Sequence, residues 1–132
     1  MCTLDQAWDF IYEYKRFIVL QGLANTYLYP SEPIDKVWCI HMAHGKNYID
    51  FCMKVCTRVF YHGVFTGNTS GGEDQSIYNM TLIFYQQIYL IPPPSMIWPP
   101  AAVRFDVNNF RHTNINLIRV SGLWTRMQQG LI

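Results

Sequence analysis

The chain has 132 residues, of which 50% are apolar, 16% aromatic and only 14% charged, and its formal net charge is +1. These values exclude a disordered chain, which needs low hydrophobicity and high net charge, and a coiled coil, which needs sustained charged heptads. They also argue against nucleic-acid binding through a strongly basic surface. About two thirds of the unfolded surface can be buried at this length, so we expect a single domain over residues 1–132.

Too few charges are present to cover the whole surface, so some apolar surface should stay exposed or meet a partner. We expect it within the longest charge-free stretch, Gln75 to Val103. That stretch is not a membrane helix, because Gln86 and Gln87 lie in its middle and five prolines interrupt it. We therefore expect no contact with a membrane.

The N-terminal residues and the cysteines both indicate a cytoplasmic protein. Met1 to Phe10 contains two aspartates and no basic region before an apolar run, so it does not resemble an export signal. The four cysteines are unevenly spaced, and a chain of this length does not need disulfides, so we expect reduced thiols.

The first predicted element is a helix from about Leu4 to Leu23. Thr3 followed by Gln6 forms a capping-box pattern at its start. Two apolar rows at helical spacing predict burial on more than one side. The rows are Leu4, Trp8, Ile11 and Ile18, and Ala7, Phe10, Tyr14 and Phe17.

A second helix is predicted from about Glu32 to Phe60, with Ser31 as its N-cap and a proline in its first turn. An apolar stripe runs along it, and most of its charged residues lie off this stripe. Gly45 weakens its middle by about 1 kcal/mol relative to alanine, so a break or a close helix crossing could occur there.

Glycine and small polar residues between His62 and Gly72 predict a loop, and a third helix follows from Glu73 to Leu90. Its expected buried face consists of Ile77, Thr81, Phe84 and Ile88.

The proline-rich run from Ile91 to Pro100 should be extended and lie across the surface. Alternation of apolar and polar residues over Val103–Val107 and Asn114–Val120 favours two short strands or a hairpin. The predicted fold is therefore mainly α: a three-helix core, a proline-rich strap and a short extended or β-hairpin C-terminal region.

The stretch from Ser31 to His41 (SEPIDKVWCIH), followed by Tyr48 to Cys52 (YIDFC), resembles bacterial members of the glycine-rich domain-containing protein-like family. That family's motif is similar to P-S-x-x-V-D-x-V-W-H-x-H-L followed by Y-x-x-F-C. Further matching pieces bring the resemblance to about residues 30–100. They are Gly71-Gly72-Glu73, Tyr78 to Leu82 with Tyr85, and Pro93 to Pro99.

The resemblance implies no settled biochemical activity. The chain also departs from the family's histidine pattern: Cys39 stands where the motif has the histidine next to tryptophan. His62 is all that remains of a later His-x-Pro-like element.

Three histidines, His41, His44 and His62, are the candidate ligands of a metal ion such as zinc. His41 lies on the apolar stripe, and His44 follows one turn later on the same side. His62 could return to this face from the loop, and Glu73 or Asp74 could supply a carboxylate. The competing interpretation, which we favour for His41, is a core histidine hydrogen-bonded to the backbone.

The cysteines give little support for catalysis. Cys39 and His41 are two residues apart on a predicted helix and should point about 200° apart, so they are unsuited to a joint site. Cys52 and Cys56 are expected to be core thiols. The sequence has no G-x-S-x-G nucleophile elbow and no phosphate-binding loop.

The favoured function is a small non-catalytic binding or interaction module, with an unknown protein partner or self-association, and with Trp38 and Trp98 as candidate interaction residues. Trp98 would dock a partner or pack on the chain's own aromatics, of which we favour the second. The alternative is a metal-binding domain, with or without enzymatic activity, around His41 and His62. A third, less favoured function is a nucleic-acid contact through the arginines of the tail: Arg104, Arg111, Arg119 and Arg126.

Overall fold

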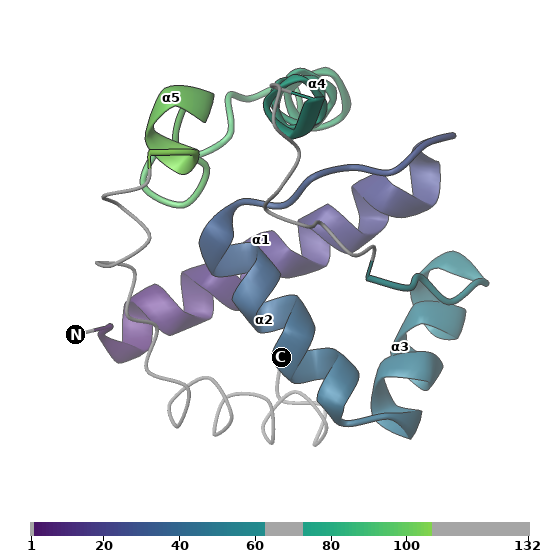
Figure 1. Cartoon of the computed structure of the whole chain (residues 1–132). Helices are drawn as coiled ribbons and strands as arrows, with labels where there is room; N and C mark the ends of the chain where they lie inside the picture. Colours follow the sequence, from purple (N-terminus) through teal and green to yellow (C-terminus); the bar gives the residue numbers. More distant parts are fainter. Residues whose placement is uncertain (1, 63–72, 107–132) are drawn as a thin grey trace.

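The computed structural model describes residues 2–62 and 73–106, and within these ranges the chain is mainly helical and has no strand. This confirms the expectation of a mainly α-helical protein. Five helices lie in the described ranges: α1 (Leu4–Leu23), α2 (Glu32–Ala43), α3 (Lys46–Cys56), α4 (Glu73–Tyr89) and α5 (Ala101–Arg104). Figure 1 shows α1 running through the middle of the molecule, where it contacts α2, α3 and α4. None of the helices described is long and apolar enough to cross a bilayer.

Helix α1 has the bounds that the sequence predicts, and a capping box fixes its first residue. The Gln6 backbone N–H donates to Thr3 Oγ1 at 3.2 Å, and the Thr3 N–H donates to Gln6 Oε1 at 2.8 Å. This reciprocal capping box satisfies two backbone donors that would otherwise lack partners. The buried residues lie on more than one side of the helix, as expected for its central position: Ala7, Ile11, Glu13, Tyr14, Phe17, Ile18, Leu20 and Gln21.

The prediction of one continuous helix from Glu32 to Phe60 is wrong, because α2 ends at Ala43 and α3 begins at Lys46. Between them Gly45 adopts a φ of 56°, which is accessible to glycine and rarely to other residues. The backbone N–H groups of residues 44 and 45 donate to carbonyls three residues earlier, at 3.0 Å each, so the last turn of α2 is tightened. The glycine that the sequence marks as a weak point is where the chain turns.

Helix α4 confirms the third predicted helix, but its buried face differs from the predicted one. Tyr78, Thr81 and Tyr85 are buried, whereas Ile88 is exposed. The tyrosines face inward because each ring buries a large apolar area and each hydroxyl finds an acceptor there. The Tyr78 hydroxyl, for example, donates to the Pro99 carbonyl at 2.6 Å.

The sequence predicts that the whole proline-rich run is extended, and this prediction is wrong because the run contains a turn. The backbone N–H groups of Ile97 and Trp98 donate to the Pro94 carbonyl at 3.0 and 2.7 Å, and this turn brings Trp98 into the core. The strand predicted from Val103 is also wrong at its start, because Val103 and Arg104 belong to α5. The other predicted strand, Asn114–Val120, lies outside the described residues.

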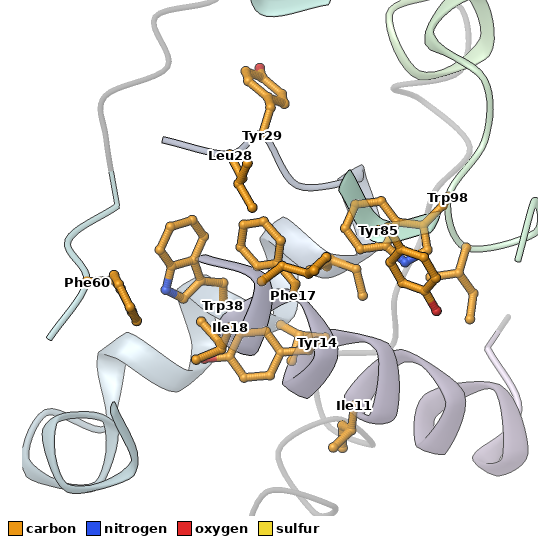
Figure 2. Packing of buried hydrophobic residues seen from close by; sticks show 14 of the residues in the cluster. Ile11, Tyr14, Phe17, Ile18, Leu28, Tyr29, Trp38, Phe60, Tyr85 and Trp98 are labelled. Carbon is orange, nitrogen blue, oxygen red and sulfur yellow. The ribbon is translucent and has the colours of Figure 1, made fainter. Parts of the chain in front are cut away.

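The core is a continuous cluster of apolar and aromatic side chains around α1, shown in Figure 2. Phe17 of α1 lies between two tryptophans, with ring centroids 5.4 Å from Trp38 of α2 and 6.1 Å from Trp98 of the proline-rich run. A single side chain of α1 thus contacts segments that are far apart in the sequence.

A buried carboxylate joins α1 to α4 and to the proline-rich run. Glu13 of α1 accepts hydrogen bonds at Oε2 from the Tyr85 hydroxyl at 2.7 Å and from Trp98 Nε1 at 3.1 Å. Arg16 lies 3.9 Å from Glu13 Oε1 and donates to the Tyr85 oxygen at 2.7 Å. Burial, followed by the hydrogen bond to Glu13, raises the pKa of Tyr85, so its hydroxyl remains a donor at neutral pH.

Replacement of this carboxylate should destabilise the fold. In Glu13→Ala the buried Tyr85 hydroxyl and Trp98 N–H lose their acceptor, and we expect the free energy of unfolding to fall by at least about 2 kcal/mol in urea denaturation. Glu13→Gln keeps an acceptor oxygen and should lose less.

Asp9→Ala, an exposed position on the same helix, is the matched control and should change stability by less than about 0.5 kcal/mol. Equal losses in Glu13→Ala and Asp9→Ala would contradict a structural role for the buried network.

Candidate functional site

The segment that follows α3 folds back over the end of α1. Helix α3 is followed by Thr57, which has a left-handed φ of 60°. The guanidinium of Arg58 then donates to three carbonyls at the C-terminal end of α1, those of residues 21, 22 and 24, at 3.1, 3.2 and 3.4 Å. A cation that bonds the last carbonyls of a helix satisfies acceptors that the helix leaves open. Arg58 therefore anchors this returning segment, residues 57–62, to α1.

The hydroxyl of Tyr48 fixes the same segment to α2 and α3. Tyr48 of α3 accepts a hydrogen bond from Trp38 Nε1 of α2 at 2.9 Å and donates one to the Phe60 carbonyl. Both side chains are buried, so neither polar group has water as an alternative partner. With Phe60 held in this way, His62 follows two residues later beside α2.

His62 meets two side chains of α2 that are one helical turn apart, Asp35 and Cys39. Its Nε2 contacts Asp35 Oδ1, and its ring centroid lies 4.7 Å from that of Trp38. One ligand atom from each of Asp35, Cys39 and His62 lies within 4.8 Å of the other two. We call these three residues the Asp35–Cys39–His62 cluster.

The cluster is accessible from solvent, since Cys39 is exposed and the other two side chains are half-buried. In residues 2–62 and 73–106, no other three histidine, cysteine or acidic side chains converge in this way. Partial burial, followed by the negative charge of Asp35, raises the pKa of the Cys39 thiol. A reactive cysteine needs the opposite shift, so Cys39 is not prepared as a nucleophile.

His41 occupies a different environment from His62. It is 1% exposed, and its ring lies among Tyr14, Tyr48 and Phe51 at centroid distances of 5.4, 5.1 and 5.0 Å. The Tyr14 hydroxyl and His41 Nδ1 share a hydrogen bond of 2.6 Å. Burial, followed by the nearby charge of His44, lowers the pKa of His41 to about 3, so the ring is neutral at pH 7. These contacts support the interpretation of His41 as a core histidine.

The predicted set of His41, His44 and His62 is not brought together as one group of ligands in the described structure. His41 is buried, His44 is exposed at the end of α2, and His62 pairs with Asp35. The carboxylate also differs from the expected Glu73 or Asp74, because the acidic residue beside His62 is Asp35. The spacing of Asp35 and Cys39, four residues on a helix, is the signal that would have found two members of the cluster.

The two predicted interaction residues, Trp38 and Trp98, are both core residues, at 1% and 2% exposure. Their burial removes them from any surface that a partner could touch in this conformation. The packing of Trp98 on Phe17, Tyr78 and Tyr85 agrees with the self-packing that we favoured for it.

Arg104, the first arginine of the tail, is buried rather than displayed to a nucleic acid. Its guanidinium lies 5.4 Å from the ring centroid of Tyr29 and 5.2 Å from that of Phe105, and its Nε donates to the Pro30 carbonyl at 3.4 Å. The other three arginines, Arg111, Arg119 and Arg126, lie outside the described residues.

An apolar groove of about 310 Å³ lies between the C-terminal end of α1 and helix α4. Leu23, Met80 and Ile83 line it with exposures of 57%, 54% and 58%. None of the residues that line this α1–α4 groove is charged; the others are Ala24, Asn25, Thr26, Leu28, Phe84 and Gln87. Exposed apolar side chains from α4 through α5 confirm that part of the expected surface lies between Gln75 and Val103: Met80, Ile83, Ile88, Leu90, Ile91, Met96 and Val103.

Comparison of the chain with protein-family models, with curated proteins and with solved structures found no match. The resemblance to the glycine-rich domain-containing protein-like family therefore stays a prediction from the sequence.

The burial of His41 predicts a specific pH dependence of stability. Between pH 6.5, its ordinary pKa, and about pH 3, the unfolded chain binds a proton that the folded chain excludes, so acid favours unfolding. For each unit by which the pH falls over that range, protonation of His41 in the unfolded chain should lower the free energy of unfolding by up to about 1.4 kcal/mol.

His41→Gln offers an acceptor for Tyr14 without titrating, and urea denaturation at several pH values should show a shallower fall between pH 6.5 and 3 than the wild type. His44→Gln, at an exposed position, removes only the smaller cause of the shift, so it should change the profile far less than His41→Gln. Identical pH profiles for wild type and His41→Gln would contradict the burial of a neutral ring.

Proposed function

We propose that the protein is a small, non-catalytic binding module of the cytoplasm, and that its contact surface is the α1–α4 groove. The observation that carries the proposal is an exposed, charge-free apolar surface made by Leu23, Met80 and Ile83. Apolar side chains that line one groove mark a contact site more often than scattered apolar residues do. Methionine suits such a surface because its flexible side chain adapts to different partners.

The simplest partner for this surface is a second copy of the chain. In a two-fold dimer the same patch meets itself, so a charged patch would repel its copy, whereas the uncharged α1–α4 groove does not. The net charge of +1 adds little repulsion between whole molecules. We therefore favour self-association over an unrelated protein partner.

Two further parts of the proposal rest on the sequence and on thiol chemistry. We place the chain in the glycine-rich domain-containing protein-like family on the motif pieces between residues 30 and 100. The cytoplasmic location is supported by four cysteines that form no disulfide: Cys2, Cys39, Cys52 and Cys56. We do not propose a metal site centred on His41, because its ring is enclosed by aromatic side chains and bonded to Tyr14.

Self-association through the groove should be lost when a charge is placed in it. We expect the molar mass of the wild type, measured by sedimentation equilibrium, to rise with concentration above that of the monomer. Ile83→Glu would bury a carboxylate in the contact and should remain monomeric at the same concentrations.

Ile49→Glu is the matched control, because Ile49 is also an exposed isoleucine on a helix but lies on α3, away from the groove. It should associate as the wild type does. A wild type that stays monomeric throughout, or an Ile83→Glu variant that associates normally, would contradict the proposal.

A further inference from the structure

The Asp35–Cys39–His62 cluster has no part in the α1–α4 groove, and its chemistry is different. We propose that it is a binding site for a single zinc ion, with one sulfur, one nitrogen and one oxygen ligand from the protein and a fourth position open to water. This site goes beyond the proposed binding module and contains neither His41 nor His44.

The donor types fit zinc better than other common cations. Zn²⁺ accepts thiolate, imidazole and carboxylate ligands together in a tetrahedral site, whereas Ca²⁺ and Mg²⁺ prefer oxygen ligands alone. Three protein ligands and one water is the arrangement of an open zinc site, and exposure of Cys39 leaves room for that water.

The geometry requires only small movements of the side chains. Zinc bonds of about 2.0–2.3 Å place tetrahedral ligands about 3.2–3.7 Å apart, and the present ligand atoms are already within 4.8 Å of one another. Asp35 and His62 now share a direct contact, so the ion would replace that hydrogen bond, with the neutral His62 ring binding through Nε2 and keeping its proton on Nδ1. Asp35 and Cys39 project from one face of α2 at a spacing of one turn, which needs no change of the backbone.

The electrostatics favour a cation at the same point. The Asp35 carboxylate lies within 4.8 Å of the Cys39 sulfur, and a divalent cation between them offsets the repulsion between a carboxylate and a thiolate. Binding therefore releases the Cys39 thiol proton to solvent as the sulfur–zinc bond forms.

The returning segment holds the third ligand in place before the ion arrives. Arg58 and Tyr48 fix residues 58 and 60 to α1, α2 and α3, and the Trp38 ring covers one side of His62. A site with this support loses less conformational freedom on binding than one assembled from a mobile loop.

The test uses the full chain, reduced and freed of metal, titrated with Zn²⁺ against a chromophoric chelator. We expect one ion per chain and a rise in melting temperature on binding. Asp35→Asn, Cys39→Ala and His62→Gln should each weaken binding by at least about tenfold. The His44→Gln and Cys56→Ala controls should bind as the wild type does.

Cys39→Ala is the decisive variant because Cys39 is exposed and its loss should leave the fold intact, which circular dichroism verifies. With Co²⁺ as a second probe, the wild type should show the near-ultraviolet charge-transfer band of a thiolate ligand, and Cys39→Ala should lack it. Wild type that binds no Zn²⁺ at one equivalent, or Cys39→Ala that binds it unchanged, would overturn the proposal. Ile83→Glu should bind zinc as the wild type does. The outcome of the zinc titration is therefore independent of whether the chain self-associates through the α1–α4 groove.

Discussion

The arrangement of α2, α3 and the returning segment depends on the hydroxyl of Tyr48. It accepts from the Trp38 indole and donates to the Phe60 carbonyl, so one buried group joins α2, α3 and the returning segment. All three polar atoms are removed from water, and a missing partner would leave a buried donor or acceptor unsatisfied. The position of His62 beside α2 follows from this constraint together with the bonds of Arg58 to the end of α1.

A buried polar group also joins the elements on the other side of α1 through hydrogen bonds. Glu13 accepts from Tyr85 and Trp98, and this joins α1 to α4 and to the proline-rich run. A chain that is 16% aromatic and 14% charged thus uses tyrosine hydroxyls and indole N–H groups to fix the relative positions of its helices. Because these groups carry both apolar area and a directional bond, they specify which faces meet. The α1–α4 groove and the Asp35–Cys39–His62 cluster are both consequences of these contacts.

Local sequence signals predict where the helices lie. They predict less well which helix faces are buried, and they do not reveal the Asp35–Cys39–His62 cluster. The capping box gives the start of α1, and acidic residues mark the start of α4, because both act within one turn of the chain. The sequence marks Gly45 as a weak point. The apolar stripe nevertheless continues on both sides of it, so periodicity alone predicts one uninterrupted helix. The buried tyrosines of α4 were missed because their acceptors, Glu13 and the Pro99 carbonyl, lie on other segments. His62 is separated from Asp35 by 27 residues, and its place is set by tertiary bonds that no local pattern reveals.

In the proposed zinc site, residues after α3 return to α2 and complete a single set of ligands from Asp35, Cys39 and His62. X-ray absorption spectroscopy of the full chain with one equivalent of Zn²⁺ tests this ligand set, because the spectrum distinguishes sulfur ligands from nitrogen and oxygen ligands. We expect one sulfur ligand at about 2.3 Å and nitrogen and oxygen ligands at about 2.0–2.2 Å. A shell without sulfur, or one with two or more sulfurs, would contradict it.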